Sequence, residues 1–246
     1  MSASHSTAIV IGASSGIGEA MVRKLAASGT RVAAVARRQG ELDRIAAACD
    51  GKVAGYGHDV RDFDVAPALF DRIVADLGGG VDLFIYNSGV MPPVEESEYN
   101  FDKDRKMIEV NLLGAIRWID LAAAHMEARR NGTLAAISSV AGERGRRGTP
   151  VYTTSKAGLT AFMEAMRNRL ARYGVEVVTV KPGPVETPMT VGLKRLPLMI
   201  SADACADGAL ALIRGGTGEG YVPAIWGLIM AIIKLVPSAI FRKTNI

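Results

Sequence analysis

Cysteine and histidine are scarce in this chain, which holds 2 cysteines and 3 histidines among 246 residues. Cys49 and Cys205 lie far apart without Cys-x-x-Cys spacing, so we expect free, partly buried thiols in a reducing compartment and no metal site. No histidine lies near Ser138 or Ser139 to activate a serine hydroxyl, which argues against acyl transfer at that place.

Long apolar runs and strong charge imbalance are absent as well. No run reaches the roughly 20 apolar residues that a membrane-spanning helix needs. Met1–Ser6 lead straight into an apolar strand, so we expect no signal peptide and a cytoplasmic protein. The net charge of +4 and a pI near 9.1 suit an anionic ligand, such as a phosphorylated cofactor or an acidic lipid surface. Basic and aromatic residues do not interleave in a stripe, so no nucleic-acid binding is expected.

Short apolar runs alternate with helical patterns along most of the chain. Helical patterns include one capped by Asp64 that runs to about Leu77 and a long one over 101–130. This alternation, without linkers or repeats, predicts an α/β fold: a single Rossmann-type doubly wound domain over 1–224, with a seven-stranded parallel sheet and helices on both faces. The expected strands are 7–11, 31–36, 53–57, 83–86, 134–137, 175–180 and 221–222.

A glycine-rich turn follows the first expected strand. Gly12 permits a tight turn, while Gly16 and Gly18 let a backbone approach a pyrophosphate and let the next helix pack closely. The free N–H groups and positive dipole end of that helix suit phosphate. A plain glycine turn is the alternative, but the strands and helices that follow favour a dinucleotide site. Its expected contacts are Gly12, Ser14, Ser15, Gly16, Ile17 and Gly18.

A second constellation joins Ser139, Tyr152 and Lys156. Tyr152 and Lys156 are four positions apart, so on a helix they share one face. An ammonium group about 4 Å from a phenol favours the phenolate by up to roughly 4 kcal/mol at an effective dielectric of about 20. Ser139 supplies a neutral donor for a carbonyl oxygen. These groups suit reduction of a ketone by hydride, or the reverse oxidation, although a surface helix with a Tyr–Lys pair is the alternative.

Together these residues resemble the classical short-chain dehydrogenase/reductase family over about 7–222. Two positions depart mildly from the family pattern: Ile11 stands where threonine is usual, and Ser88 where alanine is usual. Neither touches the chemistry. The matching features are the glycine turn, Asp59, Asn87-x-Gly89, Asn111, Ser139, Tyr152 with Lys156, and Pro182-Gly183-x-Val185-x-Thr187.

The resemblance implies a role for each matching residue. Tyr152 would give the proton to the substrate oxygen, which Ser139 would orient and polarise. Lys156 would hold the nicotinamide ribose hydroxyls and lower the pKa of Tyr152. Asn111 would hold a water that links Lys156 to solvent, unless its amide only breaks or caps the long helix. The other implied cofactor contacts are Asp59 and Val60 at the adenine, Asn87, Ser88 and Gly89 beside the adenosine ribose, and Pro182, Gly183, Val185 and Thr187 near the nicotinamide amide.

The end of the second expected strand bears on the choice of dinucleotide. Relatives that prefer NAD carry an acid there, but this chain has Ala36 followed by Arg37 and Arg38. Without the acid there is no repulsion against a 2′-phosphate, which a guanidinium can clamp with two hydrogen bonds. Each such bond contributes about 1.5–3 kcal/mol. We therefore expect NADP(H) to be favoured over NAD(H), with solvated arginines as the alternative.

Arg144, Arg146 and Arg147 follow Ser139 in a glycine-containing loop expected near the substrate mouth. They either recognise an anion on the substrate or are simply solvated, and the sequence leaves both open. This loop and the closing residues 236–246 also resemble a branch of the family that contains a polyprenylphosphoryl 2-keto-ribose reductase. That likeness implies an anionic or lipid-linked keto sugar as a candidate substrate.

The C-terminal segment 225–246 is expected to lie outside this domain, at an interface or a membrane surface, because its first half is apolar all round except for Lys234. Between Ile225 and Val236, Lys234 is the one charged residue, and Pro237 follows. A helix without a polar face must be covered by protein or lipid. The cover is its own domain, another subunit of a homodimer or homotetramer, or the inner membrane face, with Arg242 and Lys243 meeting anionic head groups.

The expected function is an NADPH-dependent carbonyl reductase acting reversibly on a ketone or its alcohol. One alternative is a regulatory protein that binds NADP(H) without turnover, against which the presence of Ser139, Asn111, Tyr152 and Lys156 argues. Another is a reductase of a different small ketone, such as a 3-ketoacyl thioester. Enoyl reduction or epimerisation on the same fold is a third, and by resemblance the thirteen-residue spacing from Ser139 to Tyr152 argues against the enoyl branch.

Overall fold

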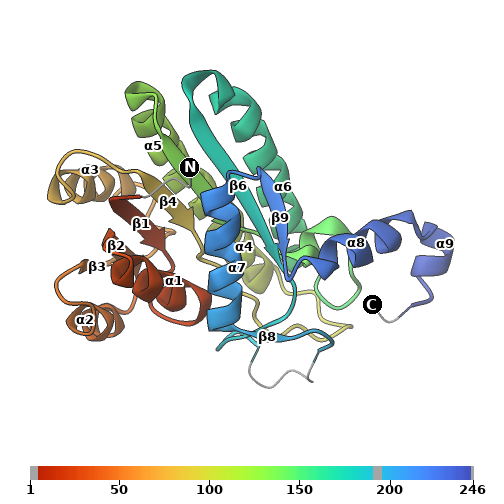
Figure 1. The fold of residues 1–246 in the computed structure, drawn as a ribbon. Coiled ribbons are helices and arrows are strands. Elements are labelled where there is room, and N and C mark those ends of the chain that lie inside the picture. Colours follow the sequence, from red (N-terminus) through yellow and green to blue (C-terminus); the bar gives the residue numbers. More distant parts are fainter. Residues whose placement is uncertain (1–4, 191–195, 245–246) are drawn as a thin grey trace.

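One parallel sheet of seven strands forms the centre of the protein (Figure 1). The computed structural model describes residues 5–190 and 196–244, so the predicted bounds at Met1 and Ile246 lie outside the described residues. The strand order is β3-β2-β1-β4-β5-β6-β9, and adjacent strands are parallel, which confirms the predicted doubly wound α/β fold. The strands are β1 (Thr7–Ile11), β2 (Arg31–Ala36), β3 (Val53–Gly57), β4 (Leu83–Tyr86), β5 (Gly132–Ile137), β6 (Val175–Pro182) and β9 (Glu219–Val222).

Alternating side chains of the strands enter two apolar cores, one on each face of the sheet. In β1, Ala8 and Val10 belong to the first core, and Ile9 and Ile11 to the second. This follows from the two-residue period of a strand. Strands buried on both faces are nearly continuous apolar runs, which is why their positions could be predicted from the sequence.

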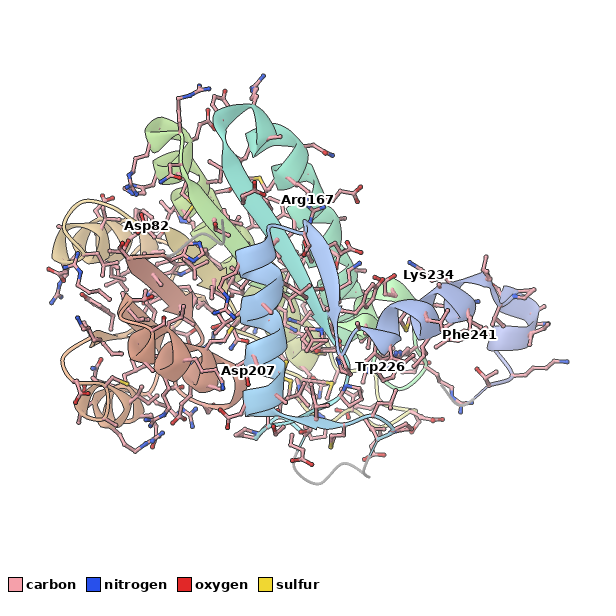
Figure 2. All side chains as sticks on the ribbon, viewed as in Figure 1. Asp82, Arg167, Asp207, Trp226, Lys234 and Phe241 are labelled. Atoms are coloured by element: carbon pink, nitrogen blue, oxygen red, sulfur yellow. The ribbon has the colours of Figure 1, made fainter. Side chains whose placement is uncertain are left out.

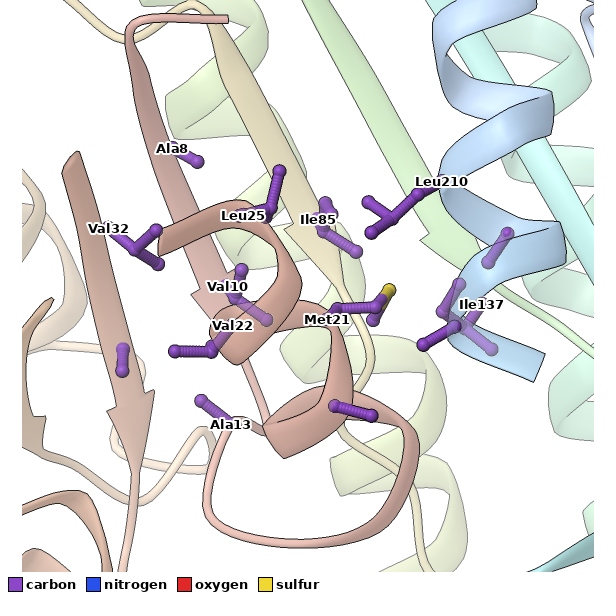
Figure 3. Packing of buried hydrophobic residues seen from close by; sticks show 14 of the residues in the cluster. Ala8, Val10, Ala13, Met21, Val22, Leu25, Val32, Ile85, Ile137 and Leu210 are labelled. Atoms are coloured by element: carbon purple, nitrogen blue, oxygen red, sulfur yellow. The ribbon is translucent and has the colours of Figure 1, made fainter. Parts of the chain in front are cut away.

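Helices cover both cores. Met21 of α1 and Leu210 of α7 pack on the first core, as Figure 3 shows, and Trp118 of α5 and Met163 of α6 are buried in the second. The helices that cover the sheet are α1 (Gly16–Ala27), α2 (Gln39–Ala47), α3 (Ala66–Asp76), α4 (Phe101–Ile108), the π-helix η1 (Glu109–Leu113), α5 (Gly114–Arg129), the 3-10 helix η2 (Val140–Glu143), α6 (Pro150–Leu170), the 3-10 helix η3 (Ala171–Tyr173) and α7 (Ala202–Gly215).

Two of the predicted helices differ from the structure. Asp64 does not cap α3, which begins at Ala66 after Val65 and has no side-chain cap. Pro67 lies in its first turn, where the missing N–H leaves no helical bond unmade. The long helix predicted over 101–130 is divided into α4, η1 and α5.

The chain after β9 forms two further helices, α8 (Ile225–Leu235) and α9 (Ser238–Phe241), beyond that edge of the sheet (Figure 1). α8 packs against β9 and η2, and Met230 is its fully buried residue. Its own domain thus covers one side of α8. Leu228, Ile232 and Leu235 remain 62%, 59% and 83% exposed.

Candidate active site

The glycine turn between β1 and α1 lies at the carboxyl edge of the sheet, where the strand order reverses between β1 and β4. Gly12 has φ +87°, and its N–H donates to the carbonyl of Val35 at 2.8 Å. A Cβ at Gly18 would lie 2.1 Å from the carbonyl oxygen of Gly12, so glycine is needed for α1 to approach this closely. The side chain of Ser15 does not cap α1, which leaves the first N–H groups of the helix to an anionic ligand.

Two other segments close around this turn. Nδ2 of Asn87 donates to the carbonyl of Gly12 at 3.0 Å, and a Cβ at Gly12 would lie 2.6 Å from the backbone nitrogen of Ser88. Gly16 has φ +57°, and a Cβ there would lie 3.1 Å from the methyl carbon of Thr187. The structure therefore brings the turn, the residues after β4 and Thr187 to one place.

Arg38 reaches from the end of β2 to the same turn. Its Nη2 donates to Oγ of Ser14 at 2.9 Å and to Oγ of Ser15 at 2.8 Å. Arg37, which lies between Arg38 and the last residue of β2, is exposed. The sequence predicted the same role for both arginines, binding of a 2′-phosphate, because it could not distinguish two neighbouring residues of one type. In the structure, Arg38 binds Ser14 and Ser15 of the glycine turn.

Asp59 and Val60 follow β3, beside the turn. Nη2 of Arg61 lies 2.7 Å from Oδ2 of Asp59. Hydrogen bonds from Arg61 lower the pKa of Asp59 to about 2, with a smaller contribution from the charge of Arg37. Asp59 therefore stays ionised and can act as a hydrogen-bond acceptor. Val60 is buried, and its carbonyl oxygen would lie 3.1 Å from a Cβ at Gly114, so glycine at the start of α5 allows this approach.

Asn111 lies in η1, the π-helical turn, and is fully buried. Nδ2 donates to the carbonyl of Val90 at 3.0 Å and to Oγ of Ser155 at 3.1 Å, while Oδ1 accepts from the N–H of Val90 at 2.7 Å. The long helix is thus interrupted here, and such π turns are frequent at functional sites. A Cβ at Gly89 would lie 3.5 Å from Nζ of Lys156 and 3.6 Å from Oδ1 of Asn111, so these three residues meet at one point.

Ser139 follows β5 directly and lies beside Tyr152, where its hydroxyl opposes the rise in the pKa of the phenol. Oγ of Ser139 accepts from the N–H of Ala141 at 3.0 Å, so its own proton can be donated toward Tyr152 or toward a substrate oxygen. A Cβ at Gly142 would lie 2.7 Å from the carbonyl carbon of Lys156. Glycine therefore allows η2, which follows Ser139, to press directly on α6.

Lys156 is buried one helical turn beyond Tyr152. Its Nζ donates to the carbonyl of Ile137 at 2.9 Å and lies 6.0 Å from the ring centre of Tyr152. Burial lowers the pKa of Lys156 to about 8. Ser138 has a structural role, because its Oγ donates to the carbonyl of Lys156 at 3.0 Å and lies 2.8 Å from Oγ1 of Thr160.

The expected lowering of the Tyr152 pKa by Lys156 was wrong for this structure. Burial raises the pKa of Tyr152, and the hydrogen bond to Ser139 and the charge of Arg146 oppose this rise without reversing it. Four-residue spacing places Tyr152 and Lys156 on one helix face, but the ammonium group bonds to the carbonyl of Ile137. A position on the same helix face is therefore not enough for Lys156 to lower the pKa of Tyr152 below its ordinary value.

Arg144 is also not available to a substrate. Its Nη1 donates to the carbonyls of Ile233 and Lys234, the latter at 3.3 Å, and its guanidinium lies 4.0 Å from the ring centre of Phe241. The last carbonyls of a helix lack partners and carry the negative end of its dipole, so a cation stabilises them. Arg144 thus caps α8, which is neither of the two predicted roles, recognition of a substrate anion or a solvated charge.

The other two arginines of the loop differ in their surroundings. Nε of Arg147 lies 3.4 Å from Oε1 of Glu96. Arg146 is half-buried, and burial lowers its pKa, while the nearby Tyr152 acts in the opposite direction. Among the three arginines, Arg146 is therefore the one whose charge acts on Tyr152.

A buried ion cluster behind η2 was missed by sequence reasoning. Glu143 accepts from Lys181 and, at 2.6 Å, from Lys234, and Lys181 also lies 2.5 Å from Glu219. The side chains of Glu143 and Lys181 are 6% and 4% exposed. Burial opposes ionisation of Glu143, but the hydrogen bonds from both lysines outweigh it and lower its pKa. The sequence feature that could have indicated this cluster is the charged Glu143, only four positions after Ser139.

Gly183 follows Pro182, the last residue of β6, and lies under the indole of Trp226, which Figure 2 shows at the junction of β9 and α8. A Cβ at Gly183 would lie 2.0 Å from Nε1 of Trp226. Val185 lies in β7 (Val185–Glu186), which pairs in parallel with β8 (Ile200–Ser201), a small sheet that the sequence did not predict. The segment 182–187 therefore runs from α8 at one end to the glycine turn at the other.

Comparison with known proteins agrees with this arrangement. An uncharacterized oxidoreductase of Myxococcus xanthus is 33% identical over 247 residues, which cover 97% of this chain and 95% of the relative. The ketoacyl reductase HetN of a Nostoc species is 29% identical over 250 residues, with 96% and 87% covered. A solved short chain dehydrogenase from Burkholderia cenocepacia, in complex with NADP, has a TM-score of 0.84 at 23% identity and covers 96% of each chain. At that identity the likeness concerns the fold.

The family model for short chain dehydrogenases matches residues 6–195. This range includes the glycine turn, the π-helical Asn111 and the Ser139–Tyr152–Lys156 group. The matched range, the full-length relatives and the strand order agree with one another. The chain therefore belongs to the short-chain dehydrogenase/reductase family.

Proposed function

We propose that the protein reduces a ketone to a secondary alcohol with NADPH, reversibly and by hydride transfer. The observation that carries this proposal is the meeting of Lys156, Asn111 and Gly89 at one point, beside the neighbouring hydroxyls of Ser139 and Tyr152. A neutral donor, a phenol and a cation at the end of a dinucleotide-type turn suit carbonyl reduction.

The residues at this edge fit a dinucleotide. Glycines at 12, 16 and 18 stand where a Cβ would meet neighbouring atoms at 2.6, 3.1 and 2.1 Å, so the turn has the close backbone packing that a pyrophosphate cradle needs. Bound NADPH would supply the hydride. The residues that would hold it are those of the turn and the first turn of α1 at the pyrophosphate, Asp59 and Val60 at the adenine, Asn87, Ser88 and Gly89 at the adenosine ribose, Lys156 at the nicotinamide ribose, and Pro182, Gly183, Val185 and Thr187 at the nicotinamide.

The preference for NADP(H) follows from the end of β2. Ala36 contributes no negative charge, and Arg38 already bonds to Ser14 and Ser15 on the phosphate side of the turn. Together with the exposed Arg37, it offers two guanidinium groups to a 2′-phosphate.

The proposed proton chemistry follows from the raised pKa of Tyr152. A raised pKa keeps the phenol protonated, which is the state that a proton donor needs for ketone reduction. Oγ of Ser139 accepts from Ala141, so its proton can turn from Tyr152 to the same carbonyl oxygen. Lys156, with a pKa of about 8, remains mainly protonated at neutral pH beside Asn111. Both N–H groups of the Asn111 amide are engaged, but its oxygen accepts only from Val90 and keeps a second acceptor site for a relay water.

Arg146 supports a proposal for the substrate class. Its guanidinium is half-buried and near Tyr152, which places a positive charge beside the proposed carbonyl position. We infer an anionic ketone, such as a phosphorylated or lipid-linked keto sugar. A 3-ketoacyl thioester is the second candidate, which the likeness to the ketoacyl reductase of Nostoc favours.

The test is to follow NADPH consumption with phosphorylated keto sugars, their uncharged counterparts and a 3-ketoacyl thioester. Turnover of one class by the parent protein, lost in Tyr152→Phe, is the expected result. Arg146→Gln should raise KM for the phosphorylated ketone and leave KM for the uncharged one unchanged, while any change of kcat through Tyr152 is shared by both; Arg105→Gln is the surface control. NADPH binding without turnover of any ketone would instead support the regulatory alternative.

A further inference from the structure

The outer side of α8 carries an uncovered apolar stripe. Its members on α8 are three or four positions apart, so they lie on one side of the helix, opposite the buried Met230. Scattered apolar residues are normal on a surface, but a continuous stripe indicates a binding face. The stripe consists of Ile225 (46% exposed), Leu228 (62%), Ile232 (59%), Leu235 (83%) and, on α9, Ile240 (57%).

Charge of one sign accompanies the stripe. Residues 223–246 contain no aspartate or glutamate, and Arg242 and Lys243 stand exposed just after α9. Lys234 is already bound to Glu143. The arm, defined as residues 225–244, therefore combines an apolar stripe with a cationic end that has no acid within the arm itself.

The arm is held firmly and projects from the body of the protein. In Figures 1 and 2 it extends away from the sheet beyond β9, with Trp226 near its base and Phe241 near its far end. Arg144 binds the carbonyl end of α8 and lies over Phe241, and Glu143 binds Lys234. These contacts fix the buried side of the arm, so the stripe faces outward.

We propose that the arm docks the protein on the surface of an anionic lipid bilayer. The stripe would lie at the boundary between head groups and acyl chains, with Arg242 and Lys243 at the lipid phosphates. Within 5–190 and 196–244 no helix is long and apolar enough to cross a bilayer, which is consistent with a helix lying flat in the interface. A second copy of the chain would cover the stripe, but its arm would bring the same positive charges and no acid to meet them.

The test is co-sedimentation of the full chain with vesicles of phosphatidylcholine alone and of phosphatidylcholine mixed with phosphatidylglycerol. We expect binding to the anionic vesicles that weakens with added salt. Leu228→Glu together with Ile232→Glu should reduce the partition coefficient at least tenfold. Arg242→Gln with Lys243→Gln should reduce binding to anionic vesicles and abolish its salt dependence. Val65→Glu, at a 49% exposed apolar site immediately before α3, is the control.

The proposal does not rest on the proposed reaction, because docking is measured without turnover. All altered positions are exposed, and circular dichroism melting checks that each variant is folded. Absence of vesicle binding by the parent protein would overturn the proposal. Vesicle binding by Leu228→Glu with Ile232→Glu that equals the binding of the parent would also overturn it. A third contrary result would be an oligomer in sedimentation equilibrium that this double variant dissociates and that added vesicles leave intact.

Discussion

Replacing Glu143 by glutamine should destabilise the protein strongly while preserving side-chain size. Glu143 is 6% exposed and joins Lys181 and Lys234, which come from β6 and α8. Glutamine removes the negative charge that these two lysines share. Lys181, which is 4% exposed, is then left with Glu219 at 2.5 Å as its remaining anionic partner.

The size of the effect follows from burial. Removing one partner of a buried ion pair costs about 3–5 kcal/mol, because an uncompensated charge remains. Lys181 keeps Glu219, so we expect a loss near the lower end, about 3 kcal/mol. Lys234 is 48% exposed, and its pair contributes no more than about 1 kcal/mol. Glu41→Gln, which removes an exposed pair with Arg44, should cost less than about 0.5 kcal/mol and serves as the control.

The assay is urea unfolding with an unchanged m value, repeated across pH. The pKa of Glu143 is lowered in the folded state, so its stabilisation is complete above the ordinary value of 4.5 and is lost as pH falls through the folded value. The difference between parent and variant should therefore shrink in acid. A loss below about 1 kcal/mol at neutral pH, or a difference that does not change with pH, would refute the reasoning.

Three other changes test the site itself. Tyr152→Phe should lower kcat by well over tenfold, a barrier rise above about 1.4 kcal/mol, while NADPH still binds; a smaller loss would show that Tyr152 is not the donor. Lys156→Ala should weaken NADPH binding and slow turnover together, so an unchanged Kd in titration would remove its ribose role. Ala36→Asp combined with Arg37→Gln should shift the ratio of kcat/KM values toward NADH. If the preference moves only when Arg38→Gln is added, Arg38 holds the 2′-phosphate.

The strands and the site residues could be predicted because each depends on local sequence. A strand such as β4 is a short run of buried apolar residues, and Gly18 is required by an approach to Gly12 within the same turn. Residue type, spacing and the family resemblance together grouped Tyr152 with Ser139. The division of the long helix at Asn111 was one of two open alternatives, because an amide alone does not reveal the π turn.

Long-range contacts could not be predicted in this way. Arg144 binds the end of α8, which lies about ninety positions away in the sequence. Glu143 and Lys181 come together across two different strand ends. The raised pKa of Tyr152 depends on burial by the whole fold and not on the nearby lysine. Each of these features depends on how distant segments pack, so it could not be predicted from the local sequence.

The contact between Gly183 and Trp226 couples the arm to the cofactor edge. The indole occupies the space that a Cβ at position 183 would need, and the segment that begins there ends with Thr187 against Gly16. If ligand binding shifted this segment, the shift would act on the indole, and any such coupling would be equal in both directions. Nε1 of Trp226 is buried without a hydrogen-bond partner in the described part of the chain, so its fluorescence is a natural reporter of that coupling. A change of its emission when either end is occupied would reveal that coupling.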